Sequence, residues 1–216
     1  DLAKVRFFAL ITQEPDALMV GKNSPYKTFD ALIAAAKANP GKIRVADQGI
    51  GSRVNLLALK IQDLYGVKFN MISYQGSAPQ REAILNGEVD AAITSLGDFA
   101  PLLNSGDALG VIEFSTVRNA GYPTVPTSKE LGLSDSLLSG SFLTLAAPAG
   151  TPDDVIAKLE TAFEKAATSK EFADWSATVG VTPDFRKGAE LKAFLDGKIS
   201  GETKALQALK DAGVLK

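Results

Sequence analysis

Two strand–turn–helix units follow each other along this chain, and both turns are rich in glycine. The apolar segment 43–46 leads into the turn Gly49–Ser52, and segment 69–73 leads into Tyr74–Ser77. If both strands are neighbours in one parallel sheet, both turns and both following helices begin at its carboxyl edge, where α/β sheets bind ligands. Helix N-termini present unpaired N–H groups and a positive dipole end. The pattern therefore predicts an anion-binding site at this edge.

The alternation of strands and helices continues along the chain. Apolar residues at helical spacing, with Thr28 as an N-cap and Gly66 as a stop, predict helices over 28–38, 52–65 and 78–85. A third strand over 89–94 completes a βαβαβ unit. Further strands are expected over 5–11, 17–20, 109–114, 139–147 and 182–185. Further helices are expected over 99–103, 127–131, 152–168 (with Thr151 as N-cap and Pro152 at the first helical position), 170–179 and 189–209.

Composition narrows the class of partner. The 216 residues are 45% hydrophobic and carry a formal net charge of -2, so the chain can bury one large core or two modest ones. A slightly acidic chain lacks the basic surface of a protein whose main partner is nucleic acid, and we expect none. No apolar run is long enough to span a bilayer. Anion binding must then come from local geometry.

Two residue types are missing, and their absence lowers the expectation of an enzyme. The chain contains no cysteine and no histidine, which excludes disulfides, thiolate nucleophiles, Ser-His-Asp triads and His-ligated zinc. Tyr74, Lys60 or a carboxylate remain as possible general bases, but no acid–base pair stands out, and no lysine follows the glycine turn as in a phosphate loop. We predict no catalysis, no metal and no cofactor.

Five short motifs in a fixed order give a more specific indication. The chain resembles the extracytoplasmic solute receptors of tripartite tricarboxylate transporters, the Bug-type binding proteins, over essentially all of its length. The motifs that carry the resemblance are Gly49–Ser52, Ser73–Pro79, Gly87–Asp90, Tyr122–Thr127 and Ala147–Pro152.

The resemblance implies a periplasmic, monomeric receptor with the two-lobed α/β fold of periplasmic binding proteins. Such a receptor closes on a small carboxylate and delivers it to a membrane permease. Residues 12–139 would form a complete lobe two, while 1–11 and 140–216 would form a lobe one that lacks its N-terminal segment. We therefore expect the chain to be a fragment of a longer receptor. The alternative is the intracellular effector-sensing domain of a regulator, which shares the two-lobed architecture.

The resemblance places the first group of ligand-binding residues around the first glycine turn. Gly49 and Gly51 would let backbone N–H groups approach a carboxylate without a Cβ in the way, although the two glycines could equally serve only a tight turn. Ser52 would add a hydroxyl. Arg53 could recognise a second carboxylate or simply be solvated. Asn55 could donate to the ligand or to a neighbouring carbonyl.

The second group follows the next two strands. Tyr74 would offer a hydroxyl to the ligand, or its ring could belong to the core, while Gly76 and Ser77 would supply N–H donors at the next helix start. Thr94 and Ser95 end the third strand at the same edge. A lysine and an aspartate common in relatives are absent near these positions, so a plain carboxylate or a neutral polar tail fits better than an amino acid.

One aromatic residue lies just past the expected crossover back to lobe one. Phe142 stands where relatives place Trp or Phe. It could wall the ligand cleft, or it could pack only beneath the hinge. Both roles remain open from the sequence.

Overall fold

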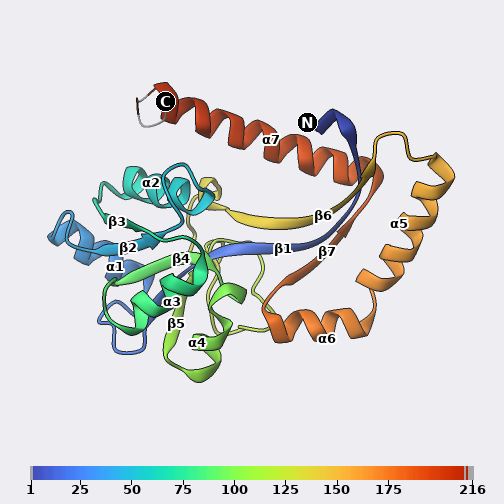
Figure 1. The fold of residues 1–216 in the computed structure, drawn as a ribbon. Coiled ribbons are helices and arrows are strands. Elements are labelled where there is room, and N and C mark those ends of the chain that lie inside the picture. The colour runs from blue at the N-terminus through green and yellow to red at the C-terminus, as the bar shows by residue number, and fades with distance from the viewer. Residues whose placement is uncertain (1, 212, 214–216) are drawn as a thin grey trace. The chain divides into compact units, whose positions relative to one another are not determined.

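The chain forms two compact units, which Figure 1 shows as a ribbon. The computed structural model describes residues 2–211 and 213. Unit 1 consists of Asp1–Gln13 and Phe142–Lys216, and unit 2 of Glu14–Ser141. The chain passes between the units twice, at positions that differ by two residues from the expected lobe boundaries at 12 and 139.

Unit 2 is built on a sheet whose strand order is β3-β2-β4-β1-β5. β2 pairs in parallel with β3 and β4, which confirms the expected βαβαβ arrangement, and β1 is antiparallel to both β4 and β5. The ends of β2, β3, β4 and β5 therefore share one side of the sheet, which we call the carboxyl edge. The strands are β1 (Val5–Gly21), β2 (Arg44–Asp47), β3 (Asn70–Ser73), β4 (Ala91–Ser95) and β5 (Ala108–Glu113).

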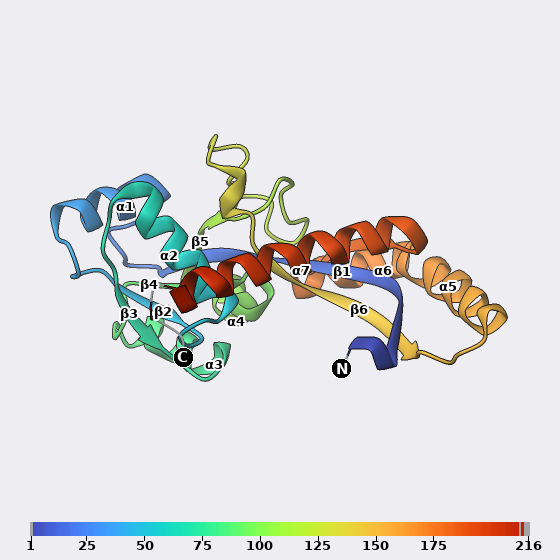
Figure 2. The same cartoon turned by 90° about the horizontal axis from the view of Figure 1, so that it is seen from above.

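Helices cover both faces of this sheet, because alternate strand residues enter two different apolar clusters. Ile93 packs in a cluster with residues of α1 and α2, while its neighbour Ala92 packs in a second cluster with residues of α3 and α4. Figure 2 shows α2 and α3 on opposite sides of β4. The helices of unit 2 are α1 (Phe29–Ala38), α2 (Arg53–Tyr65), α3 (Ser77–Leu85) and α4 (Ala100–Ser105), with short 3-10 turns η2 (Gly97–Phe99) and η3 (Asp135–Leu137).

The helix ends follow local sequence rules. Thr28 and Ser52 are the N-caps of α1 and α2, and each side chain accepts a backbone N–H from the first turn. Gly66 ends α2 in the left-handed conformation at φ 61°. The predicted cap Thr28 and the predicted stop Gly66 are confirmed.

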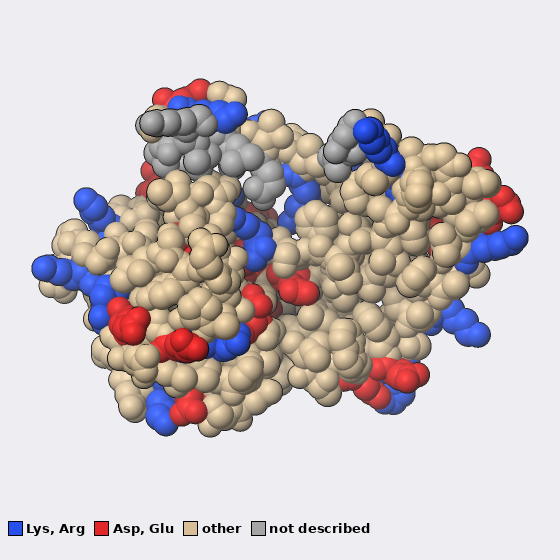
Figure 3. Space-filling view, viewed as in Figure 1, with Lys and Arg blue, Asp and Glu red and all other residues tan. Residues whose placement is uncertain are grey.

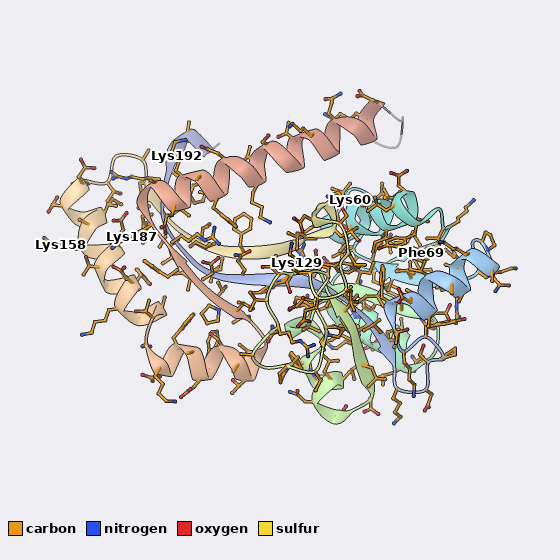
Figure 4. The ribbon with its side chains drawn as sticks, turned by 180° about the vertical axis from the view of Figure 1, so that it is seen from behind. Lys60, Phe69, Lys129, Lys158, Lys187 and Lys192 are labelled. Atoms are coloured by element: carbon orange, nitrogen blue, oxygen red, sulfur yellow. The ribbon has the colours of Figure 1, made fainter. Side chains whose placement is uncertain are left out.

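Unit 1 contains the first part of β1 together with β6, β7 and three helices. β1 pairs with β6 and runs antiparallel to β7, with Leu10 opposite Arg186. Phe8 and Ile156 belong to its apolar cluster. Lys187, which is labelled in Figure 4, forms an ion pair of 2.5 Å with Glu164 of α5. The elements are η1 (Leu2–Lys4), β6 (Gly140–Pro148), α5 (Asp153–Ala167), α6 (Lys170–Val179), β7 (Thr182–Arg186) and α7 (Gly188–Asp211).

Three sequence predictions are wrong in detail. The strands expected over 5–11 and 17–20 are one continuous strand, β1. The helix expected over 127–131 is a set of hydrogen-bonded turns, because Thr127 bridges to Glu113 instead of starting a helix. Thr151 does not cap α5. Pro152 occupies the N-cap position without a side-chain cap, and its carbonyl accepts the first helical hydrogen bonds, from Val155 and Ile156.

Helix length and hydropathy also bear on membrane spanning. Within the described part of the chain, no helix is both long and apolar enough to cross a bilayer.

Candidate functional site

Ten of the eleven predicted site residues lie at the carboxyl edge of unit 2, on the segments that follow or end β2, β3 and β4. Phe142 is the exception and belongs to unit 1. Its ring meets that of Phe194 edge-on, with centroids 5.1 Å apart, and it lines a cavity of about 600 Å³ between β6 and α7.

The turn between β2 and α2 is held by the protein's own carboxylate. Asp47 is fully buried, and its side chain accepts hydrogen bonds from the Gly49 N–H (3.0 Å), the Ser73 hydroxyl (2.6 Å) and the Asn55 amide (2.5 Å). The carbonyl of the Asn55 side chain accepts the Gly51 N–H at 3.2 Å. Both glycine N–H groups are thus engaged internally, and their φ angles of 106° and 79° explain the need for glycine.

The start of α2 nevertheless keeps free donors. The Ser52 hydroxyl accepts the Asn55 N–H at 3.3 Å, as in an ordinary N-cap. The N–H groups of Arg53 and Val54 have no hydrogen-bond acceptor within the described residues. Two of the donors that a helix N-terminus leaves unsatisfied therefore remain for a ligand.

The Arg53 side chain is committed to a buried ion pair. Its Nε and Nη2 bond to the Asp16 carboxylate at 2.7–3.1 Å, and the Ser139 hydroxyl bonds to the same carboxylate at 2.6 Å. Asp16 is fully buried, whereas the Arg53 side chain is 27% exposed. This contact ties the start of α2 to the β1 and 139 segments of unit 2.

The start of α3 is open by contrast. Gly76 occupies the N-cap position at φ 94° and provides no side-chain cap. The N–H groups of Ser77 and Ala78 donate to no residue that the structure describes. Gln75, Gly76 and Ala78 are exposed, so this end of the helix is accessible to solvent.

A guanidinium that the sequence interpretation did not single out lies beside this helix start. Arg81, one turn into α3, donates through Nη1 to the Asp98 carbonyl (2.5 Å) and to the Ser77 hydroxyl (3.3 Å). It therefore joins the segments that follow β3 and β4. The four-residue spacing from Ser77 is the sequence signal that would have placed it there.

The other three predicted side chains are used within the protein. The Tyr74 ring packs against the α3 and α4 cluster. Burial and the negative charge of Glu88, before β4, raise the pKa of its hydroxyl. Thr94 accepts the Gln48 amide at 3.2 Å and bonds to the Asp98 carboxylate. The Ser95 hydroxyl accepts the Asp98 N–H at 3.1 Å.

A further buried acid, also missed from the sequence, ends β5 at this edge. Glu113 is 1% exposed, and burial raises the pKa of its carboxyl to about 7 against weaker opposing hydrogen bonds from Ser115 and Asn119. Its Oε1 has no hydrogen-bond partner in the described structure. The described residues contain no group of three acidic, His or Cys side chains that could hold a metal.

The surface charge is mixed. Figure 3 shows Lys and Arg interspersed with Asp and Glu over the face in view. An anion site at the carboxyl edge would thus depend on local donors and not on a broad positive field.

Comparison with known proteins places this geometry in a family. The model of the tripartite tricarboxylate transporter family receptors, TctC, matches residues 1–210. The chain belongs to this family. It is 30% identical over 192 residues to a protein of the gbd 5′ region of Cupriavidus necator and 30% identical over 191 residues to BugT of Bordetella pertussis. These alignments cover 89% and 88% of the chain but only 58% of each relative.

Solved receptors share the fold. A TctC solute-binding protein from Polaromonas, determined without ligand, has a TM-score of 0.79 at 26% identity, covering 95% of this chain and 70% of that one. Rpa4515 of R. palustris with adipate has a TM-score of 0.80 at 23% identity, covering 97% and 69%. MatC of Rhodopseudomonas palustris with bound malate has a TM-score of 0.67 at 26% identity, covering 82% and 60%. The fold is that of the periplasmic receptors of this family.

Proposed function

We propose that the chain is the ligand-binding part of a periplasmic receptor that captures a small carboxylate and delivers it to a tripartite tricarboxylate-type permease. The observation that supports this most is the pair of helix starts at the carboxyl edge of unit 2. Together they hold four N–H groups without acceptors in the described structure, on Arg53, Val54, Ser77 and Ala78. Such groups and the positive helix ends favour a carboxylate.

Family membership supports the chemical class of the ligand. Rpa4515 is described with adipate and MatC with malate, both small dicarboxylates. By extension, we propose a compact di- or monocarboxylate for this chain.

The receptor acts without chemistry. Stripping water from a carboxylate costs several kcal/mol unless strong hydrogen bonds replace the lost hydration, and charge-assisted N–H bonds at two helix starts do so. Binding shifts the receptor population toward the form that the permease recognises. A monomer without cofactor suffices for this role.

A thermal-shift screen of the full-length protein tests the proposal. A ligand present at one hundred times its Kd stabilises the folded state by about 2.7 kcal/mol, which raises the Tm measurably. We expect a rise with adipate, malate or benzoate and none with sugars or nucleotides. Hits confined to sugars or nucleotides would overturn the proposal.

A single backbone donor can be deleted to locate the site. Ala78→Pro removes an N–H that has no acceptor among the described residues, and the first helical turn tolerates proline. We expect about tenfold weaker carboxylate binding, the size of one lost charge-assisted hydrogen bond, with an unchanged Tm of the free protein. Lys60→Met, on the exposed side of α2 (Figure 4), is the matched control and should bind as the wild type does.

A further inference from the structure

Arg81 differs from every other arginine of the chain. All six arginines are described, and five of them form an ion pair with a carboxylate, whereas Arg81 forms none with the described residues. Its acceptors are a carbonyl and a hydroxyl, which leave its charge unneutralised. The five pairs are Arg6–Asp153, Arg44–Asp90, Arg53–Asp16, Arg118–Glu130 and Arg186–Asp184.

The nitrogens of Arg81 that have no acceptor in the described structure, Nε and Nη2, are the pair through which two other arginines of unit 2 bind carboxylates. Arg44 and Arg53 both grip their aspartates through Nε and Nη2, at 2.7–3.1 Å. Arg81 uses only Nη1, so Nε and Nη2 have no acceptor in the described structure. The edge of the guanidinium that makes two parallel hydrogen bonds to a carboxylate is open.

The guanidinium is also held in place before any ligand arrives. The Asp98 carbonyl and the Ser77 hydroxyl fix Nη1, and Arg81 is half-buried. The Asp98 carboxylate does not compete, since it bonds to Thr94 and forms no ion pair with Arg81. An arginine whose guanidinium is already held by hydrogen bonds loses less side-chain entropy on binding a ligand than a freely moving arginine does.

We propose that Arg81 is the residue that determines specificity for an acid group, binding a ligand carboxylate through Nε and Nη2 at the start of α3. This inference rests on the proposed receptor function and names the group that recognises the ligand. It also moves the main anion contact from the first glycine turn, where Gly49 and Gly51 donate internally, to the segment that follows β3. The ligand class is a carboxylate that presents both oxygens to one planar fork.

The test compares Arg81 variants of the full-length protein with the wild type by isothermal titration calorimetry. The probes are adipate, malate and benzoate, together with the fully amidated analogue of whichever acid binds most tightly. Arg81→Met should weaken carboxylate binding at least 30-fold and Arg81→Lys by a smaller factor, because a lysine cannot make the two parallel bonds. Lys60→Met, which removes the same charge from an exposed position, should leave binding unchanged.

The ratio of acid to amide affinity keeps the test informative if a variant is less stable. In the wild type the acid should bind far more tightly than its amide, and in Arg81→Met the two should bind within about threefold of each other, whatever fraction of the protein is folded. A wild-type acid-to-amide ratio retained in Arg81→Met would overturn the role of Arg81 while leaving the receptor function intact. Absence of any carboxylate binding to the wild type would instead overturn the receptor function.

Discussion

The starts of α2 and α3 occupy equivalent places at the carboxyl edge, but the N–H groups around them are satisfied in different ways. At α2, side chains of the protein satisfy three donors: Asp47 takes the Gly49 N–H, Asn55 takes the Gly51 N–H, and Ser52 caps the helix. At α3, no side chain caps the helix. Both starts keep two N–H groups without acceptors in the described structure, and only the second adds a cation that forms no ion pair there.

The two arginines repeat this difference. The Arg53 guanidinium binds the buried Asp16 carboxylate, whereas the Arg81 guanidinium binds no carboxylate in the described structure. Similar glycine turns in the sequence therefore do not imply similar roles. The position of each carboxylate decides which helix start is left for an anion.

Breaking the Arg53 pair should give the largest effect. Arg53→Met leaves the fully buried Asp16 carboxylate without its cation, and we expect the free energy of unfolding to fall by about 3–5 kcal/mol. Urea unfolding measures this. Arg118→Met, which breaks a half-exposed pair with Glu130, should lower the free energy of unfolding far less, because water screens an exposed pair. A stable Arg53→Met protein that no longer binds carboxylates would show that the comparison assigns the two arginines the wrong way round.

Asp47→Ala removes the carboxylate that holds the turn between β2 and α2. The change leaves the Gly49 N–H and the Asn55 amide without their buried acceptor, and we expect a loss of about 3 kcal/mol in urea unfolding. Ser73→Ala removes only one donor to the same carboxylate and should cost about 1 kcal/mol. Equal costs for the two variants would mean that Asp47 does not organise the turn.

Glu113 extends the comparison to a carboxylate with an unpaired oxygen. Its pKa is about 7 in the folded protein against an ordinary 4.5, so between these pH values the folded state holds a proton that the unfolded chain has lost. The stabilisation is complete below pH 4.5 and disappears as pH rises to about 7, a fall of about 3 kcal/mol in the free energy of unfolding.

Glu113→Gln should abolish this pH dependence. Urea unfolding of both proteins at pH 4.5, 6 and 8 provides the measurement. As pH rises, the free energy of unfolding of the variant should increase relative to that of the wild type. An identical slope in the two proteins would show that another group titrates.

The smallest change in stability should distinguish the capped start of α2 from the start of α3, which has no side-chain cap. Ser52→Ala removes an N-cap and should cost about 1 kcal/mol, whereas Ser77→Ala removes no cap and should change stability by less than about 0.5 kcal/mol. Thermal unfolding of both variants is sufficient. An equal or greater loss from Ser77→Ala would contradict this difference, and would show that the Ser77 hydroxyl, which accepts from Arg81, stabilises the start of α3 as much as a cap does.

Local features of the fold were predictable from the sequence. The cap Thr28, the stop at Gly66 and the parallel order of the βαβαβ strands depend on near neighbours and hydrophobic periodicity, and the structure has them as expected. The sequence predicts two strands in place of the long strand β1, because Gln13–Asp16 contains polar residues and a proline that indicate a loop. Its continuity depends on pairing with distant strands.

The site was less predictable because its residues select partners across the sheet. Arg53 was proposed to bind ligand, yet its fork meets Asp16, 37 residues earlier. Tyr74 packs its ring into the α3 and α4 cluster, with the Glu88 charge acting on its hydroxyl, and its contact with a ligand stays a prediction. Arg81 was overlooked since it lies in no glycine motif, and only the hydrogen bonds of Nη1 reveal its free nitrogens.

The most direct test of carboxylate recognition at the start of α3 is a crystal structure of the full-length protein with its tightest-binding carboxylate. We predict carboxylate oxygens within hydrogen-bond distance of Arg81 Nε and Nη2 and of the Ser77 N–H. A ligand whose carboxylate lies away from the carboxyl edge of unit 2, with Arg81 still unpaired, would contradict it.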